Sequence, residues 1–90
     1  MSVVDNKQKS RFELPVENDV AIAEYTRDGD TITFTHTAVP EHIQERGVAS
    51  RVVKFALDQA RAEGLKVVPT CPFVAAYIRK HPEYQDLLKT

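Results

Sequence analysis

The chain has 90 residues, which suits one small domain, because a single hydrophobic core typically needs on the order of 100 residues. An apolar fraction of 42% and a charged fraction of 28% are ordinary for a globular protein and argue against disorder. The net charge of -1 lacks the cationic excess that binding to a phosphate backbone demands, so we expect no nucleic-acid partner. No apolar run approaches the roughly 18 residues that span a bilayer, and the first ten residues contain no signal-peptide core. We therefore expect a cytoplasmic protein without membrane contact.

The cysteine content of the chain limits how the fold can be stabilised. The single cysteine, Cys71, cannot form an internal disulfide, and no spacing of Cys and His resembles a zinc site. We therefore expect no metal and a fold that packing alone holds together.

The first half of the chain contains strand patterns. Residues 1–10 are polar with little to bury, which predicts a mobile leader before a single domain at 11–90. Residues 11–14 alternate in polarity and end at Pro15, as an edge strand would. Residues 20–26 are rich in strand formers, and the turn that follows them contains Gly29, so a hairpin is expected.

The partner strand of that hairpin is predicted at residues 31–39, before Pro40. Strict alternation places Ile32, Phe34, His36 and Ala38 on one face and four threonines on the other. We therefore expect His36 to share a face with core residues.

A helical period follows Gly47. Apolar residues recur at i, i+3, i+4 and i+7 from Ala49 onward, which predicts an amphipathic helix over about 48–63, with Gly64 at its C-terminal cap. A short apolar strand is predicted at 65–68, and a second helix runs from Pro72 until His81 and Pro82 break it. A final turn at 83–88 is expected to dock Tyr84 and Leu87.

The predicted order is strand, strand, strand, helix, strand, helix. The fold class is therefore α+β or α/β, with a mixed sheet of three antiparallel strands, a right-handed β-α-β crossover and a C-terminal helix.

The most informative stretch for function precedes the long helix. A helix N-terminus carries unpaired N–H groups and a partial positive charge, so it favours an anion such as phosphate. Gly47 lets such a group approach the main chain, whereas the alternative is that this glycine only turns the chain into the helix.

The pattern Gln44-x-x-Gly47-x-Ala49 resembles the acetyl-CoA pyrophosphate loop of the GNAT superfamily of N-acetyltransferases. More specifically, the chain resembles the minimal GNAT-like family, whose members are as short as this one. The matching segments are 34–40 (FTHTAVP), 46–50 (RGVAS), 68–74 (VPTCPFV) and 77–84 (YIRKHPEY).

This resemblance implies that acetyl-CoA is the acetyl donor, that an amine is the acceptor, and that the pantetheine arm lies in a wedge between strands 31–39 and 65–68. Main-chain groups of Ala38 and Val39 would pair with pantetheine, and those of 46–49 would hold the pyrophosphate. The residues assigned to the coenzyme are Thr37, Ala38, Val39, Gln44, Glu45, Arg46, Gly47, Val48, Ala49, Ser50, Cys71, Phe73, Tyr77 and Lys80. Two positions depart from the family: Ala38 replaces a common Glu, and Glu45 replaces a common Gly.

Three residues are candidates for catalysis. Cys71 precedes Pro72 at a helix start, where the helix dipole lowers a thiol pKa, so it is a nucleophile, a proton donor to the departing thiolate, or an inert buried thiol. His36 is either a base beside the acyl group or a core histidine. Tyr77 lies where related enzymes place a tyrosine that protonates the thiolate, and a core role is the alternative.

Two functions from different classes follow. The first is an N-acetyltransferase acting on an unidentified amine. The second is a non-catalytic module that binds coenzyme A or a protein. A chain this short lacks the further strands that shape an acceptor pocket, so the groove is open or is completed by a protein partner or a second copy.

Overall fold

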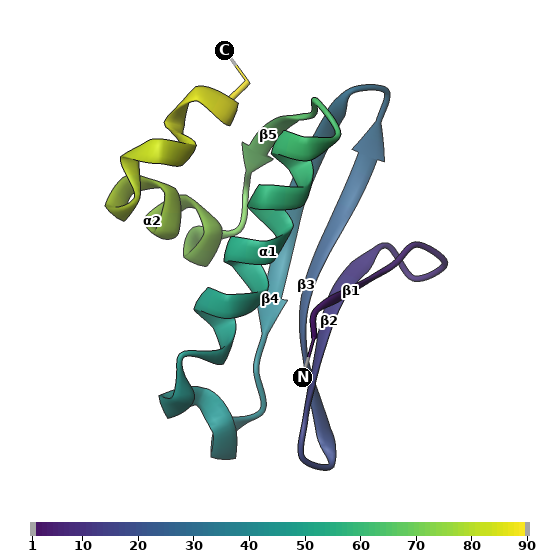
Figure 1. The fold of residues 1–90 in the computed structure, drawn as a ribbon, viewed down its shortest axis with the longest axis vertical. Helices are drawn as coiled ribbons and strands as arrows, with labels where there is room; N and C mark the ends of the chain where they lie inside the picture. The colour runs from purple at the N-terminus through teal and green to yellow at the C-terminus, as the bar shows by residue number, and fades with distance from the viewer. Residues whose placement is uncertain (1, 90) are drawn as a thin grey trace.

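The computed structural model describes residues 2–89, apart from the side chains of residues 44–46. A five-stranded sheet in the order β1-β2-β3-β4-β5 lies behind the helices (Figure 1). Its elements are β1 (Val4–Asn6), β2 (Arg11–Val16), β3 (Asp19–Asp28), β4 (Thr31–Ala38), the 3-10 helix η1 (Glu41–Arg46), α1 (Val48–Ala62), β5 (Lys66–Pro69), α2 (Pro72–Lys80) and the 3-10 helix η2 (Pro82–Leu87).

The sheet is mixed, as predicted. Strands β1 to β4 pair antiparallel with their neighbours, and β5 pairs parallel with β4 after the chain crosses over through α1. A parallel pair requires such a crossover, because the chain must return to the same end of the sheet. The observed sheet contains one more antiparallel strand than expected, because β1 was not predicted.

Strand β1 corrects the expected mobile leader. Val4–Asn6 pairs with β2, and the hydroxyl of Tyr25 donates a hydrogen bond to the Asp5 carboxylate at 2.6 Å. The leader prediction is therefore wrong at these residues. Polar composition concealed the strand, because main-chain pairing and a contact across 20 residues hold it in place.

Strand β2 extends past its expected end at Leu14 and includes Pro15. Proline lacks an N–H and is tolerated where one side of a strand is unpaired. Pairing with β1 stops at Glu13, so Pro15 removes no hydrogen bond on that side.

Helix α1 covers one face of the sheet (Figure 1) and was predicted to within one residue at its C-terminal end. Gly64 follows it with φ at 71°, as a left-handed cap requires. Tyr84 and Leu87 of η2 are buried as expected, in the same core as the helix. The helix buries Val48, Val52, Val53, Ala56, Leu57 and Ala60. No helix in the described part of the chain is long and apolar enough to cross a membrane.

A bulge interrupts the pairing of β3 with β4. Tyr25 pairs with Phe34, but the preceding residue of β3, Glu24, pairs with His36. Thr35 is thus an extra residue on β4. An extra residue in one strand of a pair changes which side chains face the core beyond it.

The bulge overturns the predicted alternation along β4. Ile32 and Phe34 are buried in the core, whereas His36 is exposed and Ala38 is half-buried. Thr37 instead points toward the helices, where its hydroxyl contacts Cys71. His36 and Ala38 therefore do not share a face with Ile32 and Phe34.

Candidate functional site

The candidate site begins where β5 stops. The parallel pairing ends at Phe34 and Pro69, while β4 continues to Ala38. The carbonyl of Phe34 accepts hydrogen bonds from the Cys71 N–H at 2.9 Å and the Thr70 hydroxyl at 2.8 Å. These two hydrogen bonds hold the residues that follow β5 against β4, at the last pair of the parallel ladder. Beyond this point no described strand pairs with β4 on the β5 side. The pairing stops because β5 ends at Pro69, and on that side the margin of β4 beyond Phe34 has no described strand beside it.

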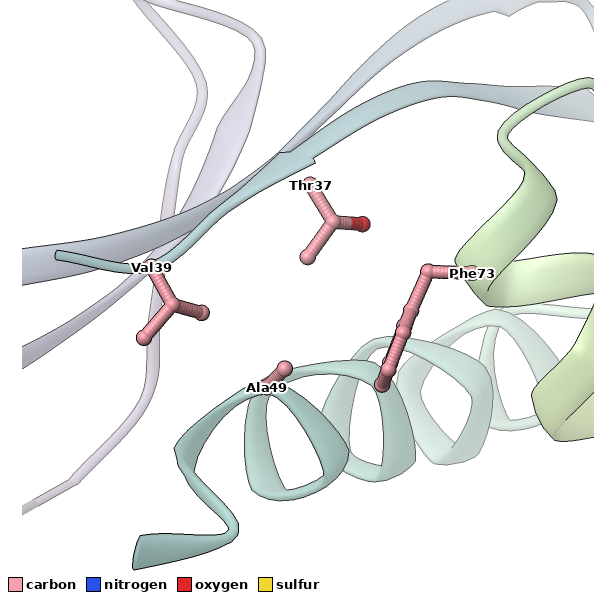
Figure 2. A pocket seen from close by; sticks show the side chains of 4 residues that line it. All are labelled: Thr37, Val39, Ala49 and Phe73. Atoms are coloured by element: carbon pink, nitrogen blue, oxygen red, sulfur yellow. The ribbon is translucent and has the colours of Figure 1, made fainter. Parts of the chain in front are cut away.

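A cavity of about 310 Å³ lies beside this margin. Figure 2 shows the side chains of Thr37, Val39, Ala49 and Phe73 lining it, with Ala49 on α1 and Phe73 on α2. Phe73 is 39% exposed, so part of its ring offers apolar surface at this site. Residues of β4, α1 and α2, and Val39 just after β4, therefore meet around one hollow of mixed apolar and hydroxyl character.

The N-terminus of α1 adjoins this cavity through Ala49. Gly47 caps the helix with φ at 67°, and the first hydrogen bond of the helix runs from the Arg51 N–H to the Gly47 carbonyl at 3.2 Å. The N–H groups of the preceding first turn, at Val48, Ala49 and Ser50, point out of the helix end and suit an anion. A Cβ at Gly47 would meet nothing within 4 Å, so backbone conformation rather than crowding requires glycine there.

Cys71 contacts Thr37, one of the residues that line the cavity. It is the N-cap residue of α2, is only 4% exposed, and lies with its sulfur 3.4 Å from the Thr37 hydroxyl oxygen. Burial raises the pKa of the Cys71 thiol. Hydrogen bonds from the Thr37 hydroxyl and from the N–H groups of Val74, Phe73 and Thr37 lower that pKa by more, so it lies below the ordinary value. The arrangement makes Cys71 a stronger acid than an ordinary cysteine thiol.

Tyr77 and Lys80 lie elsewhere on α2. Tyr77 stacks on the His81 ring at 4.0 Å between centroids and packs near Tyr84, so it faces η2 and is not among the described residues that line the cavity. Burial raises its pKa. Lys80 is exposed at the last residue of α2, whereas the cavity lies at the first turn. The structure does not bring either residue to the hollow.

The other predicted residues differ in where they lie: Val48 is buried in the core, and Ser50 is exposed. Thr37, Val39, Ala49 and Phe73, four residues of the predicted coenzyme set, line the cavity together. His36 is exposed on the opposite face of β4. The side chains of Gln44, Glu45 and Arg46 lie outside the described part of the chain.

Thr70 was missed from the sequence. Its hydroxyl donates a hydrogen bond to the Phe34 carbonyl, 36 residues away, and so holds the chain after β5 against β4. Its position between Pro69 and Cys71 was the only local indication of a role, and sequence position alone does not show which distant residue a hydroxyl will bond. The contact of Thr37 with Cys71 was missed for the same reason.

Comparison with known proteins agrees with this geometry. The pattern of the family described as GCN5-related N-acetyl-transferase matches residues 11–87. Protein NATD1 of Mus musculus is 32% identical over 88 residues, covering 94% of this chain and 80% of the mouse protein. Protein NATD1 of Danio rerio is 29% identical over 90 residues, covering 97% of this chain and 82% of its own length.

The fold also matches a solved structure. A GCN5-like protein from Staphylococcus aureus, determined by NMR in solution, superimposes with a TM-score of 0.76 at 24% identity and covers 98% of this chain and 87% of its own. The family pattern spans most of the chain and includes the cavity, the glycine cap and Cys71. The chain therefore belongs to the family of GCN5-related N-acetyltransferases.

Proposed function

We propose that this protein binds acetyl-CoA and transfers its acetyl group to an amine. The observation that carries the proposal is the hollow formed by the end of β4 and the first turns of α1 and α2, beside a strand margin without a neighbouring strand. Membership of the acetyltransferase family supports it.

The residues present suit each part of the coenzyme. On the β5 side, main-chain groups of β4 beyond Phe34 have no described strand beside them and would pair with the amides of the pantetheine arm, as an added strand would. Phe73 and Val39 supply apolar contact for its methylenes and methyl groups. The first-turn N–H groups of α1 would hold the pyrophosphate. When bound, the coenzyme supplies a thioester whose acetyl group is activated for transfer.

Binding is tested by thermal unfolding with and without acetyl-CoA. At 100 times its dissociation constant, the coenzyme should add about 2.7 kcal/mol to the free energy of unfolding. We expect Gly47→Glu to abolish this gain, because its side chain and negative charge would meet the phosphates at the helix N-terminus.

Gly29→Glu is the matched control. Gly29 has φ at 61° and Gly47 has φ at 67°, and a Cβ at either position meets nothing within 4 Å, so both variants carry the same backbone strain. Gly29 lies in the turn before β4, at the other end of the strand from the cavity. Loss of the gain in both variants, or in neither, contradicts the placement of the phosphates. Absence of any gain in the native chain contradicts coenzyme binding altogether.

Cys71 is our candidate for a direct chemical role. Its lowered pKa and its position between Thr37 and the first turn of α2 support either of two functions: accepting the acetyl group from the thioester, or donating a proton to the departing thiolate. Mass spectrometry after incubation with acetyl-CoA separates them, because only the first leaves an acetyl group on Cys71. An unmodified thiol together with undiminished turnover by Cys71→Ser contradicts both.

A further inference from the structure

Helix α1 departs from its amphipathic pattern on its outer face. Arg51, Lys54, Phe55 and Asp58 are at i, i+3, i+4 and i+7, a spacing that places side chains on one face of a helix. All four are exposed, and we call them the outer stripe of α1. Phe55 is the apolar member of the stripe and is 38% exposed. Its ring therefore provides apolar surface directly beside charged groups.

The outer stripe borders a hollow of about 370 Å³. Ser2 and Val3 of the N-terminal segment line the hollow together with the four residues of the stripe. Val3 packs against the core, and the ring of Phe55 packs edge-on against Phe12 with 6.1 Å between centroids. The core thus holds both apolar residues of the hollow in place. The volume lies within the range of about 300–1,000 Å³ that is usual for small-molecule sites.

The charges of the outer stripe are not balanced within it. Lys54 Nζ donates a hydrogen bond to Asp58 Oδ2 at 2.8 Å, so these two charges compensate each other. The side chain of Arg51 makes no hydrogen bond or ion pair with any residue that the structure describes. One positive charge therefore remains beside the apolar surface. A guanidinium presents a planar fork of N–H groups, and that geometry matches a carboxylate.

This hollow is separate from the cavity that we assign to the coenzyme. No described residue lines both. Ala49 lines the cavity, whereas Arg51 leaves the helix about 200° further round, because an α-helix turns by about 100° per residue. A molecule held at the outer stripe would therefore lie on the other side of α1 from the proposed coenzyme.

We propose that the hollow at the outer stripe is a second ligand site, and that its ligand is a small carboxylic acid with an apolar body. Arg51 binds the carboxylate, and Phe55 and Val3 contact the apolar body. One carboxylate matches the one cation that has no partner, and this complementarity selects a monoanion over a neutral or cationic molecule. The site does not depend on the acetyl transfer proposed above.

Binding is tested by NMR titration of the coenzyme-free chain with 3-phenylpropanoate. We expect the Nε–H signal of Arg51 and the methyl signals of Val3 to shift with saturation. The uncharged 3-phenylpropanamide should bind about threefold to tenfold more weakly, as loss of a partly exposed ion pair predicts. Acetate keeps the charge but lacks the apolar body, so it should bind at least about tenfold more weakly.

Arg51→Gln should weaken binding of 3-phenylpropanoate by about threefold to tenfold and change that of the amide by less than about twofold. Arg79→Gln is the matched control. Arg79 is exposed on α2, makes no hydrogen bond or ion pair with a described residue, and loses the same charge in the variant. This control should change both affinities by less than about twofold. Equal losses in the two variants would show that net charge attracts the acid, and would overturn the site.

Two other assignments of this surface are tested with the same signals. Retention of 3-phenylpropanoate in saturating coenzyme A supports a second site, whereas displacement assigns Arg51 to the phosphates and overturns it. Tighter binding of Nα-acetyl-aspartyl-phenylalanine amide than of 3-phenylpropanoate assigns the surface to a protein segment and overturns the small-molecule ligand. Absence of saturable shifts at Arg51 and Val3 overturns the proposal outright. A chain that binds 3-phenylpropanoate but no coenzyme A contradicts only the proposed function.

Discussion

The hydroxyl oxygen of Thr37 lies 3.4 Å from the sulfur of Cys71, across 34 residues of sequence. This contact joins the end of β4 to the first turn of α2 at the wall of the cavity. It also contributes to the lowered pKa of the thiol, in which burial acts in the opposite direction. The contact therefore has two roles: it holds α2 against the end of β4, and it lowers the pKa of the thiol for which we propose a chemical role.

Replacing the Thr37 hydroxyl should make Cys71 a weaker acid. Thr37→Val keeps the branched shape but removes the hydrogen bond that favours the thiolate, so the pKa of Cys71 should rise. The pH dependence of thiolate absorbance in the ultraviolet measures it. Thr35→Val is the matched control, because the Thr35 hydroxyl is near the Glu24 carbonyl instead. An equal change in both variants would contradict the role of the Thr37 contact.

The two faces of β4 should differ sharply in stability measurements. Phe34→Ala should lower the free energy of unfolding by about 3–5 kcal/mol, because Phe34 is fully buried. His36→Ala should change it by less than about 0.5 kcal/mol, because the side chain is exposed. Urea unfolding of both variants measures these values. A large loss in His36→Ala would mean that the bulge at Thr35 does not turn the histidine outward.

Strand β1 should loosen when its tyrosine contact is removed. Tyr25→Phe retains the ring packing against Phe12 but removes the hydrogen bond to Asp5, which should cost about 1 kcal/mol. Hydrogen exchange should accelerate in β1 and in the facing part of β2. Asp5→Asn keeps an acceptor oxygen and should have a smaller effect. Unchanged exchange in Tyr25→Phe would show that main-chain pairing alone holds β1.

The contact between η2 and α1 should weaken in acid. Tyr84 donates a hydrogen bond to Asp58 at 2.6 Å, and Lys54 approaches the same carboxylate at 2.8 Å. Burial raises the pKa of Asp58, but these two partners lower it more, so it lies below the ordinary value. A carboxyl group with a depressed folded-state pKa stabilises the protein above its unfolded value near 3.9, and this stability is lost as pH falls through the lower folded value.

Tyr84→Phe should therefore cost about 1 kcal/mol at neutral pH and less in acid, at pH values below the unfolded pKa near 3.9, as urea unfolding under the two conditions would show. Tyr77→Phe is the control, because the Tyr77 hydroxyl makes no hydrogen bond with a described residue. A penalty for Tyr84→Phe that is the same at both pH values would exclude the Asp58 carboxylate as the partner that matters.

Much of the fold was predictable because its signals are local. The apolar period of 48–63 and the position of Gly64 located α1, and strand formers around Gly29 located the β3–β4 hairpin. The segments around Gly47 and Cys71 identified the family correctly, and four predicted coenzyme residues line one cavity.

What required the tertiary structure depends on pairing between distant residues. Alternation along 31–39 predicted His36 in the core, but the bulge at Thr35 exists only relative to β3, which pairs Glu24 with His36 and Tyr25 with Phe34. Strand β1 depends in the same way on its partner strand and on Tyr25.

The sequence by itself therefore determined most of the helical and extended segments and which family the chain resembles, because propensity, periodicity and motif spacing are properties of neighbouring residues. Only the tertiary structure decided which side chains point into the cavity and which lie on the opposite side of the sheet. Strand register is set by contacts across the sheet, and a shift of one residue exchanges the two faces.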